Sequence, residues 1–220
     1  MSEMNSTLRL RRVKHGYTTG ARSLASRSVT GLARTRVTPN VLTASGVSLC
    51  LVAAVLVGFE DRNPWLFYWL AAVTFVVGSL LDILDGALAR AGGKSTPFGA
   101  FIDSTTDRVG EGAMLAAIAL VFSRHGQDWA VVLAVAAVVG SFLVSYTRAR
   151  AEALGLRGDV GLGSRAERVA VITAGLVFAP WGGLPWAIVL LAATAWLTVV
   201  QRILHVRKQL SGGTSGIDQR

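Results

Sequence analysis

The architecture of this chain follows from Asp82-Ile-Leu-Asp85-Gly86-Ala-Leu-Ala89-Arg90, followed after eight residues by Gly99-Ala-Phe-Ile-Asp103-Ser-Thr-Thr-Asp107. The aspartates recur three or four residues apart, so on two helices each pair lies on one face. The surrounding sequence is apolar, where an ionised side chain costs roughly 2.5 kcal/mol or more if it lies within a membrane. The nearby bases Arg90 and Arg108 do not balance four acids. The cluster therefore requires further cations.

The ligand type indicates which cation. Carboxylate oxygens suit hard cations, and Mg²⁺ typically combines a few carboxylates with phosphate oxygens of a substrate. Two helices that face each other would build one acidic pocket from these aspartates. We therefore predict a Mg²⁺ site, with Mn²⁺ as an alternative ion, and a diphosphate substrate.

The segment between the two aspartate pairs predicts a helix end and a helix start. Gly92, Gly93 and Pro97 stop one helix, and Ser95 or Thr96 can cap the next. This loop resembles a phosphate-binding P-loop only superficially, because the glycine that such a loop needs is replaced by leucine and no strand precedes it.

Three residues of the motif point to a ligand close to the backbone. Gly86 lies inside a helix, where glycine costs about 0.5 to 1 kcal/mol relative to alanine. The alternative for Gly86 and Gly99 is close helix packing, which is common in membranes. Arg90 has the chemistry to clamp a phosphate with two hydrogen bonds, whereas an arginine at the membrane interface would only set orientation; the spacing of Arg90 from Asp82 favours the clamp.

The composition indicates an integral membrane protein. The 220 residues are 52% hydrophobic and 16% charged, and several apolar runs approach the ~20 residues that cross a bilayer as a helix. We predict an all-α integral membrane protein with six transmembrane helices and an N-terminal interfacial amphipathic helix. The predicted spans are 40–59, 65–84, 98–122, 129–147, 168–181 and 184–205.

The distribution of lysine and arginine orients these spans. Alternate sides of the predicted membrane segments hold 19 and two basic residues. By the positive-inside rule both termini lie in the cytoplasm, and so does the end of the bundle that carries the aspartates. We predict a multi-pass protein of the cell membrane with its active site on the cytoplasmic side.

The chain divides into three predicted regions. Residues 1–36 hold eight basic residues and one acid, which is typical of an amphipathic segment on the anionic inner leaflet or of a basic tail. Nucleic-acid binding is the weakest interpretation, since no aromatic-interleaved patch accompanies the charge. Residues 37–208 form the helical domain, and 209–220 a mobile polar tail.

The pattern Asp-x2-Asp-Gly-x2-Ala-Arg-x8-Gly-x3-Asp-x3-Asp resembles the signature of the CDP-alcohol phosphotransferase family. The resemblance implies a six-helix membrane fold, a homodimer, and displacement of CMP from a CDP-linked lipid such as CDP-diacylglycerol by an alcohol. It also implies two divalent ions held by the four aspartates, with Asp107 as the base that takes the proton of the alcohol.

A second segment joins this resemblance. The residues Asn40, Val41, Leu42 and Thr43 are similar to the segment that contacts the CDP-lipid in these enzymes. Thr96 in the loop, together with Gly86, Arg90 and Gly99, completes the implied CDP-lipid site. Helix capping is a compatible role for Asn40.

The acceptor is indicated by arginines further along the chain. The stretch from 145 to 168 resembles the corresponding loop of the actinobacterial phosphatidylinositol phosphate synthases, although Arg148 replaces a lysine there. That resemblance implies that inositol phosphate is bound by four arginines, Arg148, Arg165, Arg168 and Arg202. A phosphorylated acceptor requires such cations, and a neutral alcohol does not. A loop that only sets orientation, and glycerol 3-phosphate as the acceptor of a phosphatidylglycerophosphate synthase, remain the alternatives.

Other functional classes explain less of the sequence. An ion or proton transporter needs polar residues through to the outer side, whereas these acids gather at one end. A prenyltransferase of the UbiA type also binds magnesium diphosphate through aspartates, but it needs more helices and lacks the glycine and arginine pattern. A purely structural membrane protein leaves the acids unexplained.

Overall fold

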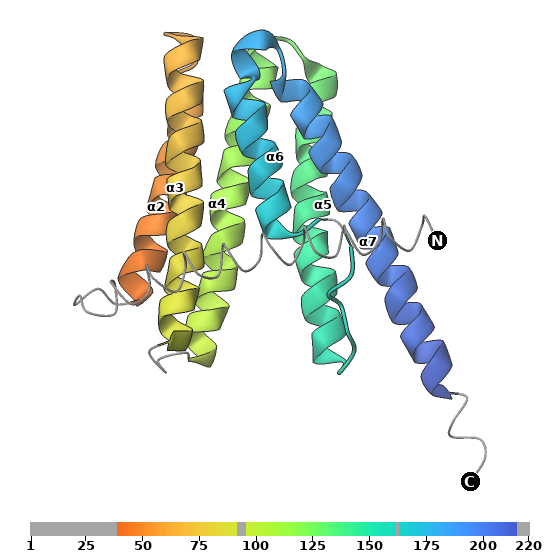
Figure 1. Cartoon of the computed structure of the whole chain (residues 1–220). Helices are drawn as coiled ribbons and strands as arrows, with labels where there is room; N and C mark the ends of the chain where they lie inside the picture. The colour runs from red at the N-terminus through yellow and green to blue at the C-terminus, as the bar shows by residue number, and fades with distance from the viewer. Residues whose placement is uncertain (1–38, 92–95, 162, 215–220) are drawn as a thin grey trace, which may run out of the picture.

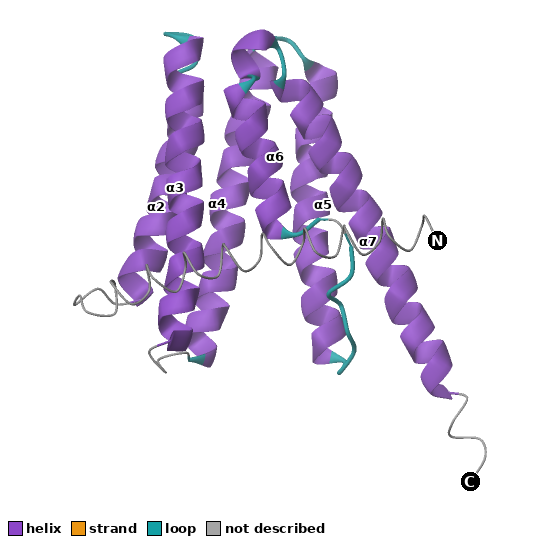
Figure 2. Ribbon diagram, in the orientation of Figure 1, coloured by secondary structure: helices purple, strands orange, loops and turns teal. Residues whose placement is uncertain are grey.

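The computed structural model describes residues 39–91, 96–161 and 163–214, and their regular structure is helical. Figures 1 and 2 show the helices side by side in one bundle. In chain order they are α2 (Pro39–Val57), α3 (Pro64–Ala91), α4 (Pro97–Arg124), α5 (Asp128–Ala153), α6 (Arg165–Val177), the short 3₁₀ helix η1 (Ala179–Trp181) and α7 (Leu184–Thr214).

Each predicted span overlaps a helix, although the fifth span, 168–181, extends beyond the end of α6 at Val177 and through η1. Among the described residues, three segments are long and apolar enough to cross a membrane, namely Pro64–Gly86, Asp128–Ala153 and Leu184–Ser211. The apolar part of α2, Val41–Val57, is shorter. Acidic side chains lower the hydropathy of α4, and α6 has only 13 residues. The all-α class and three candidate spans are therefore observed.

One predicted boundary differs from the structure. Helix α7 continues to Thr214, so the boundary drawn at 208 lies inside it. This part of α7 is held by side-chain contacts, because Gln209 bonds the backbone of Arg157 in the loop before α6. The predicted amphipathic segment 1–36 and residues 215–220 lie outside the described residues.

The loop before α6 places the start of α6 inside the bundle. It runs from the end of α5 back along the bundle, between α5 and α7, before α6 starts (Figure 2). Ser164 caps α6 through a capping box with Glu167, which satisfies backbone N–H groups at the helix start. The first turn of α6, with Arg165 and Arg168, therefore lies within the bundle rather than at its end (Figure 1).

Glycines bring α2 and α3 into close contact beside the aspartates. A Cβ atom at Gly78 would lie 2.8 Å from the carbonyl oxygen of Gly46 and 3.0 Å from the sulfur of Cys50. A Cβ atom at Gly46 would lie 3.4 Å from the backbone nitrogen of Asp82. Small residues are the usual means of such close packing between membrane helices. The pair sets the distance between α2 and the Asp82 turn of α3.

The core lies around α4, which packs against α2 and α5. Its buried face is apolar above the aspartates and includes Met114, Leu115 and Ile118, none of which is exposed to solvent. Phe75 of α3, Ile172 of α6 and other buried side chains complete one continuous cluster. Dense apolar packing therefore fills this part of the bundle, and the aspartates of α3 and α4 lie outside it.

Substitution of Gly78 tests the close helix contact. Gly78→Ala should lower the free energy of unfolding by about 1 to 3 kcal/mol, because its new methyl group meets backbone that cannot move away. The measurement is thermal unfolding of the purified protein in detergent. Gly112→Ala is the matched control, since its nearest neighbour is the end of the Phe142 ring. Equal melting temperatures for both variants would contradict the assignment.

Candidate active site

Three aspartates converge at one end of the bundle. Asp82 and Asp85 of α3 are buried, and Asp103 of α4 is half-buried. One oxygen from each carboxylate lies within 4.8 Å of the other two. Helices α3 and α4 thus bring together three of the four aspartates that were predicted to form one pocket. Three carboxylates at this separation repel one another strongly unless cations lie between them.

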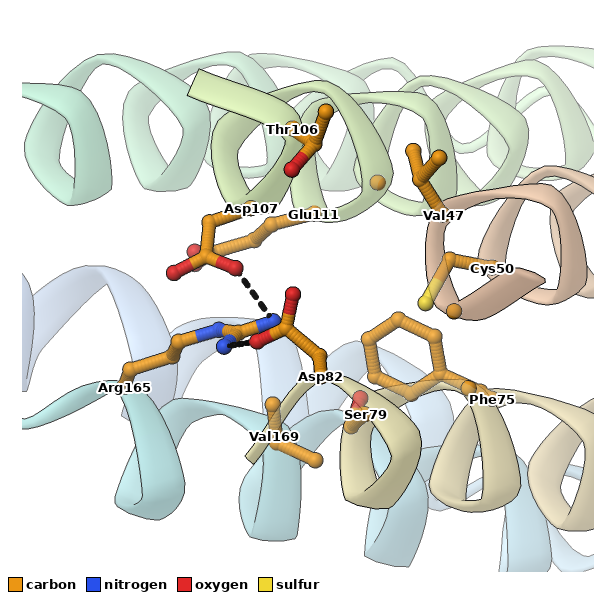
Figure 3. Close-up of a pocket in the computed structure, with 13 residues that line it drawn as sticks. Val47, Cys50, Phe75, Ser79, Asp82, Thr106, Asp107, Glu111, Arg165 and Val169 are labelled. Atoms are coloured by element: carbon orange, nitrogen blue, oxygen red, sulfur yellow. Dashed lines mark hydrogen bonds and ion pairs between the residues drawn. The ribbon is translucent and has the colours of Figure 1, made fainter. Parts of the chain in front are cut away.

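The fourth aspartate is joined to this group through an arginine. Asp107 lies one turn along α4 from Asp103, and its Oδ1 is 2.7 Å from the Nη2 of Arg165. The same guanidinium forms an ion pair with Asp82. In Figure 3 the two carboxylates, from α4 and α3, point toward Arg165 from α6. Arg165 was predicted to bind the acceptor, and in this structure it forms ion pairs with two of the aspartates.

The residues present fit a divalent cation. The hydroxyl of Thr43 donates a hydrogen bond to one oxygen of Asp85. The other oxygen, Oδ1, is buried and has no hydrogen-bond partner within the described part of the chain. Such an orphaned oxygen is costly unless it binds a ligand. Asp82, Asp85 and Asp103 supply the oxygen donors that a hard cation prefers.

The four residues predicted to contact the CDP-lipid, 40–43, have different environments in the structure. Thr43 reaches the aspartates, whereas Leu42 is buried and packs near Leu88 of α3. Val41 is 54% exposed and lines an open hollow on α2. Asn40 belongs to α2, but its side chain lies outside the described residues.

The other motif residues lie at the end of α3 and at the start of α4. Thr96 is the N-cap of α4, and its side-chain oxygen accepts a hydrogen bond from the N–H of Gly99 at 3.0 Å. The capping prediction is therefore confirmed. Gly86 follows Asp85 within α3 and is half-buried. Arg90 belongs to the last turn of α3, and its side chain is outside the described part.

A larger cavity of about 260 Å³ adjoins the aspartates. Asp107 and Arg165 line both this cavity and the small pocket drawn in Figure 3. All four arginines predicted for the acceptor lie in the cavity wall. The wall consists of Asp107, Arg108, Glu111, Val144, Ser145, Arg148, Asp159, Gly161, Gly163, Ser164, Arg165, Arg168 and Arg202.

Besides Arg165, two more of these arginines are held by internal contacts. Arg168 binds Glu111 through two hydrogen bonds, of 2.7 and 2.8 Å, and donates a third to the carbonyl of Gly163 at 2.8 Å. Arg202 donates to the carbonyl of Val160 at 2.9 Å and to that of Val144. Both side chains therefore shape the cavity wall as well as charging it.

Arg148 differs from these buried arginines. Its side chain is 56% exposed and pairs with Glu152 at 2.8 Å, one turn along α5. Ion pairs at such exposed positions contribute little stability, at most about 1 kcal/mol. An anion in the cavity can therefore attract Arg148 at low cost.

Glu111 is a site residue that the sequence reasoning missed. It is 6% exposed and holds Arg168 in place. The spacing of Asp103, Asp107 and Glu111 continues one stripe along α4, because each lies four residues after the last. That continuation was the signal available in the sequence.

A second carboxylate group lies at the other end of the bundle. Glu60 and Asp61 meet His125 at the turn between α2 and α3. His125 Nε2 is 3.0 Å from Glu60, and Arg124 lies 3.8 Å from Asp61. Burial raises the pKa of Glu60. These acids are paired by side chains of the protein, whereas Asp85 keeps a buried oxygen with no hydrogen-bond partner among the described residues. The candidate metal centre is therefore the aspartate group of α3 and α4.

Comparison with known proteins gives a family and several relatives. The family model for CDP-alcohol phosphatidyltransferase matches residues 36–201. The chain is 38% identical over 182 residues to a phosphatidylinositol phosphate synthase of Mycolicibacterium smegmatis, covering 79% of each chain. It is 36% identical over 183 residues to an archaetidylinositol phosphate synthase of Pyrococcus horikoshii, covering 83% of this chain and 90% of that one.

Solved structures show the same fold. A crystal structure of the phosphatidylinositol phosphate synthase of Mycobacterium tuberculosis with CDP-DAG bound superposes with a TM-score of 0.73 at 31% identity, covering 84% of this chain and 94% of that one. Another structure of that enzyme, in complex with manganese and citrate, gives a TM-score of 0.72 at 32% identity, covering 83% and 88%.

Metal binding distinguishes the two carboxylate groups. Asp103→Asn should weaken Mn²⁺ binding about tenfold or more, because it removes a charged oxygen ligand from the α3–α4 group. Electron paramagnetic resonance of free Mn²⁺ measures this without turnover. Asp61→Asn, in the opposite group, is the control and should leave binding unchanged. Weakening by Asp61→Asn alone would reverse the assignment.

Proposed function

Because the chain belongs to the CDP-alcohol phosphatidyltransferase family, we propose that it transfers the phosphatidyl group of CDP-diacylglycerol to a hydroxyl of inositol phosphate. The products are phosphatidylinositol phosphate and CMP. The observation that carries this proposal is the cavity in which Asp107 lies beside five arginines, the four predicted for the acceptor and Arg108. An acidic base and a cationic wall in one cavity suit an alcohol that bears a phosphate.

The relatives support the choice of acceptor. The synthases from Mycolicibacterium and Pyrococcus differ in the lipid of their names, yet both names give an inositol phosphate product. The arginine-rich wall favours a phosphorylated acceptor over free inositol or serine, since a neutral alcohol gains nothing from so many guanidinium groups.

Asp107 is the proposed general base. The acceptor hydroxyl loses its proton to the Asp107 carboxylate while its oxygen bonds to the phosphorus that carries the diacylglycerol. The bond from that phosphorus to the bridging oxygen breaks, and CMP leaves with this oxygen. A carboxylate is a weak base toward an alcohol, so proton transfer accompanies late bond formation. Arg165 holds the carboxylate of Asp107 in position at 2.7 Å.

Asp82, Asp85, Asp103 and Asp107 are the proposed ligands of two divalent ions, Mg²⁺ or Mn²⁺. Such ions neutralise a diphosphate and stabilise charge on the leaving group. The protein contributes the fixed carboxylates, with Asp85 oriented by Thr43. The CDP-lipid lies against α2 near 40–43 and beside Gly86, Arg90, Thr96 and Gly99.

The remaining membrane features belong to the proposal as well. We assign all six helices to the membrane, with the basic segment 1–36 on its inner surface and the aspartates on the cytoplasmic side of the cell membrane. The active form is a homodimer embedded in membrane lipid. The excess of basic residues on one side of the predicted spans supports this orientation.

A comparison of acceptors tests the function. Purified protein is mixed with CDP-diacylglycerol and Mg²⁺, and CMP release is followed with inositol phosphate, free inositol and glycerol 3-phosphate in turn. We expect release with inositol phosphate alone. Equal or faster release with glycerol 3-phosphate would instead identify a phosphatidylglycerophosphate synthase.

Substitution of the base separates catalysis from binding. Asp107→Asn should reduce turnover by at least about 100-fold, within the usual contribution of a general base. Binding of CDP-diacylglycerol, measured by calorimetry in detergent, should remain. Asp128→Asn, an exposed position at the opposite end of the bundle, is the control. Normal turnover in Asp107→Asn would remove Asp107 as the base.

Arg148 offers the clearest test of the acceptor pocket. Removal of Arg168 would leave Glu111 buried and unpaired, a loss of about 3 to 5 kcal/mol that would obscure binding effects. Arg148→Ala should raise the KM for inositol phosphate about tenfold, the value of one charge-assisted hydrogen bond, without changing that for the CDP-lipid. Arg150→Ala is the matched control, because Arg150 is exposed on the same helix and outside the cavity wall. Equal effects of the two substitutions would indicate a general effect of charge.

A further inference from the structure

The described part of the α5–α6 loop, residues 154–161 and 163–164, forms one wall of the cavity proposed for the acceptor. Asp159, Gly161, Gly163 and Ser164 all line it. This segment lies between α5 and α6, outside both helices. Backbone without helical hydrogen bonds must be positioned by other contacts, or a ligand has to order it on binding.

Helix α7 provides those contacts along one face. A Cβ atom at Gly161 or Gly163 would lie 2.4 or 2.9 Å from Thr198, so the loop backbone rests directly on that side chain. One turn further, Arg202 donates from Nε to the carbonyl of Val160 at 2.9 Å. Both contacts are made inside the protein, since Thr198 and Arg202 are buried.

The third contact lies near the end of α7 and is reciprocal. The Nε2 of Gln209 donates to the carbonyl of Arg157 at 2.8 Å, and its Oε1 accepts from the Arg157 N–H at 3.1 Å. A primary amide has one acceptor and one donor group in the geometry that a peptide unit needs. Thr198, Arg202 and Gln209 are spaced four and seven residues apart, which places them on one face of the helix.

Asp159 lies between two of these anchors. Gln209 holds the chain two residues before it, and Arg202 holds the residue after it. Its carboxylate is an acidic group in a wall rich in arginine. Carboxylates accept hydrogen bonds from hydroxyl groups, which a polyol phosphate carries in addition to its phosphate. The position of this loop therefore matters to a polyhydroxylated acceptor.

We infer that Gln209 is a positioning residue for the acceptor, because its amide fixes the loop that carries Asp159 into the cavity wall. This inference rests on the proposed function. Gln209 does not line the cavity, so it acts through the loop. Without it, the acceptor must order the segment around Arg157 and Asp159 on binding, which reduces affinity. The CDP-lipid site lies on α2, α3 and α4 and does not depend on this contact.

The first experiment separates the two substrates kinetically. Gln209→Leu keeps the size of the side chain and removes both hydrogen bonds. It should raise the KM for inositol phosphate about three- to tenfold, in keeping with the loss of one or two neutral hydrogen bonds. The kcat and the KM for CDP-diacylglycerol should stay unchanged. Lys208→Ala, the exposed neighbour on α7, is the control and should match the parent protein.

The second experiment observes the loop without any acceptor. In Gln209→Leu, hydrogen exchange of the backbone amides from 154 to 160 should become faster, while exchange in α4 stays the same. Unchanged exchange in the loop, or an unchanged KM for inositol phosphate, would overturn the positioning role. Absence of CMP release by the parent protein with inositol phosphate would instead refute the proposed function, and the exchange result would still report on the loop.

Discussion

The constraint on this structure is that several negatively charged carboxylates lie close together inside a helix bundle. Asp82 and Asp85 are buried, and their neighbours on α4 face them across a short distance. Mutual repulsion in such a setting is tolerated only when cations are supplied. Within the described residues Arg165 supplies one, and it reaches the aspartates because α6 starts inside the bundle. Asp85 also has an oxygen with no hydrogen-bond partner among the described residues, and this oxygen is available as a ligand for a divalent ion.

Helices α2, α3 and α4 each help to position the carboxylates. Glycines at 46 and 78 bring α2 against α3, which allows Thr43 to reach Asp85. Substitution with larger residues would separate the helices and the hydroxyl from the carboxylate. The apolar core around Met114 keeps α4 in register with both helices. Close packing between α2 and α3 therefore determines which groups can reach the carboxylates.

The arginines of the cavity have different roles despite their common charge. Arg168 is satisfied by Glu111 and a backbone carbonyl, so it mainly connects α6 to α4. Arg202 connects α7 to the loop before α6. Arg148 lies at the exposed edge, where only a weak ion pair must be exchanged for a ligand. A buried arginine that already has hydrogen-bond partners adds positive potential to the cavity and fixes the form of its wall. An exposed arginine can instead move toward an anion.

The sequence by itself determined the helices, the motif and the site at which carboxylates gather, because periodicity and spacing along one chain express these directly. It also predicted a helix cap at Ser95 or Thr96, and the structure places this cap at Thr96. Only the tertiary structure showed that Arg165 lies between Asp82 and Asp107, that Glu111 holds Arg168, and that α7 extends to fix the α5–α6 loop. The physical reason is that these partners are separated by some 50 to 80 residues, so their pairing depends on how helices pack and where α6 begins.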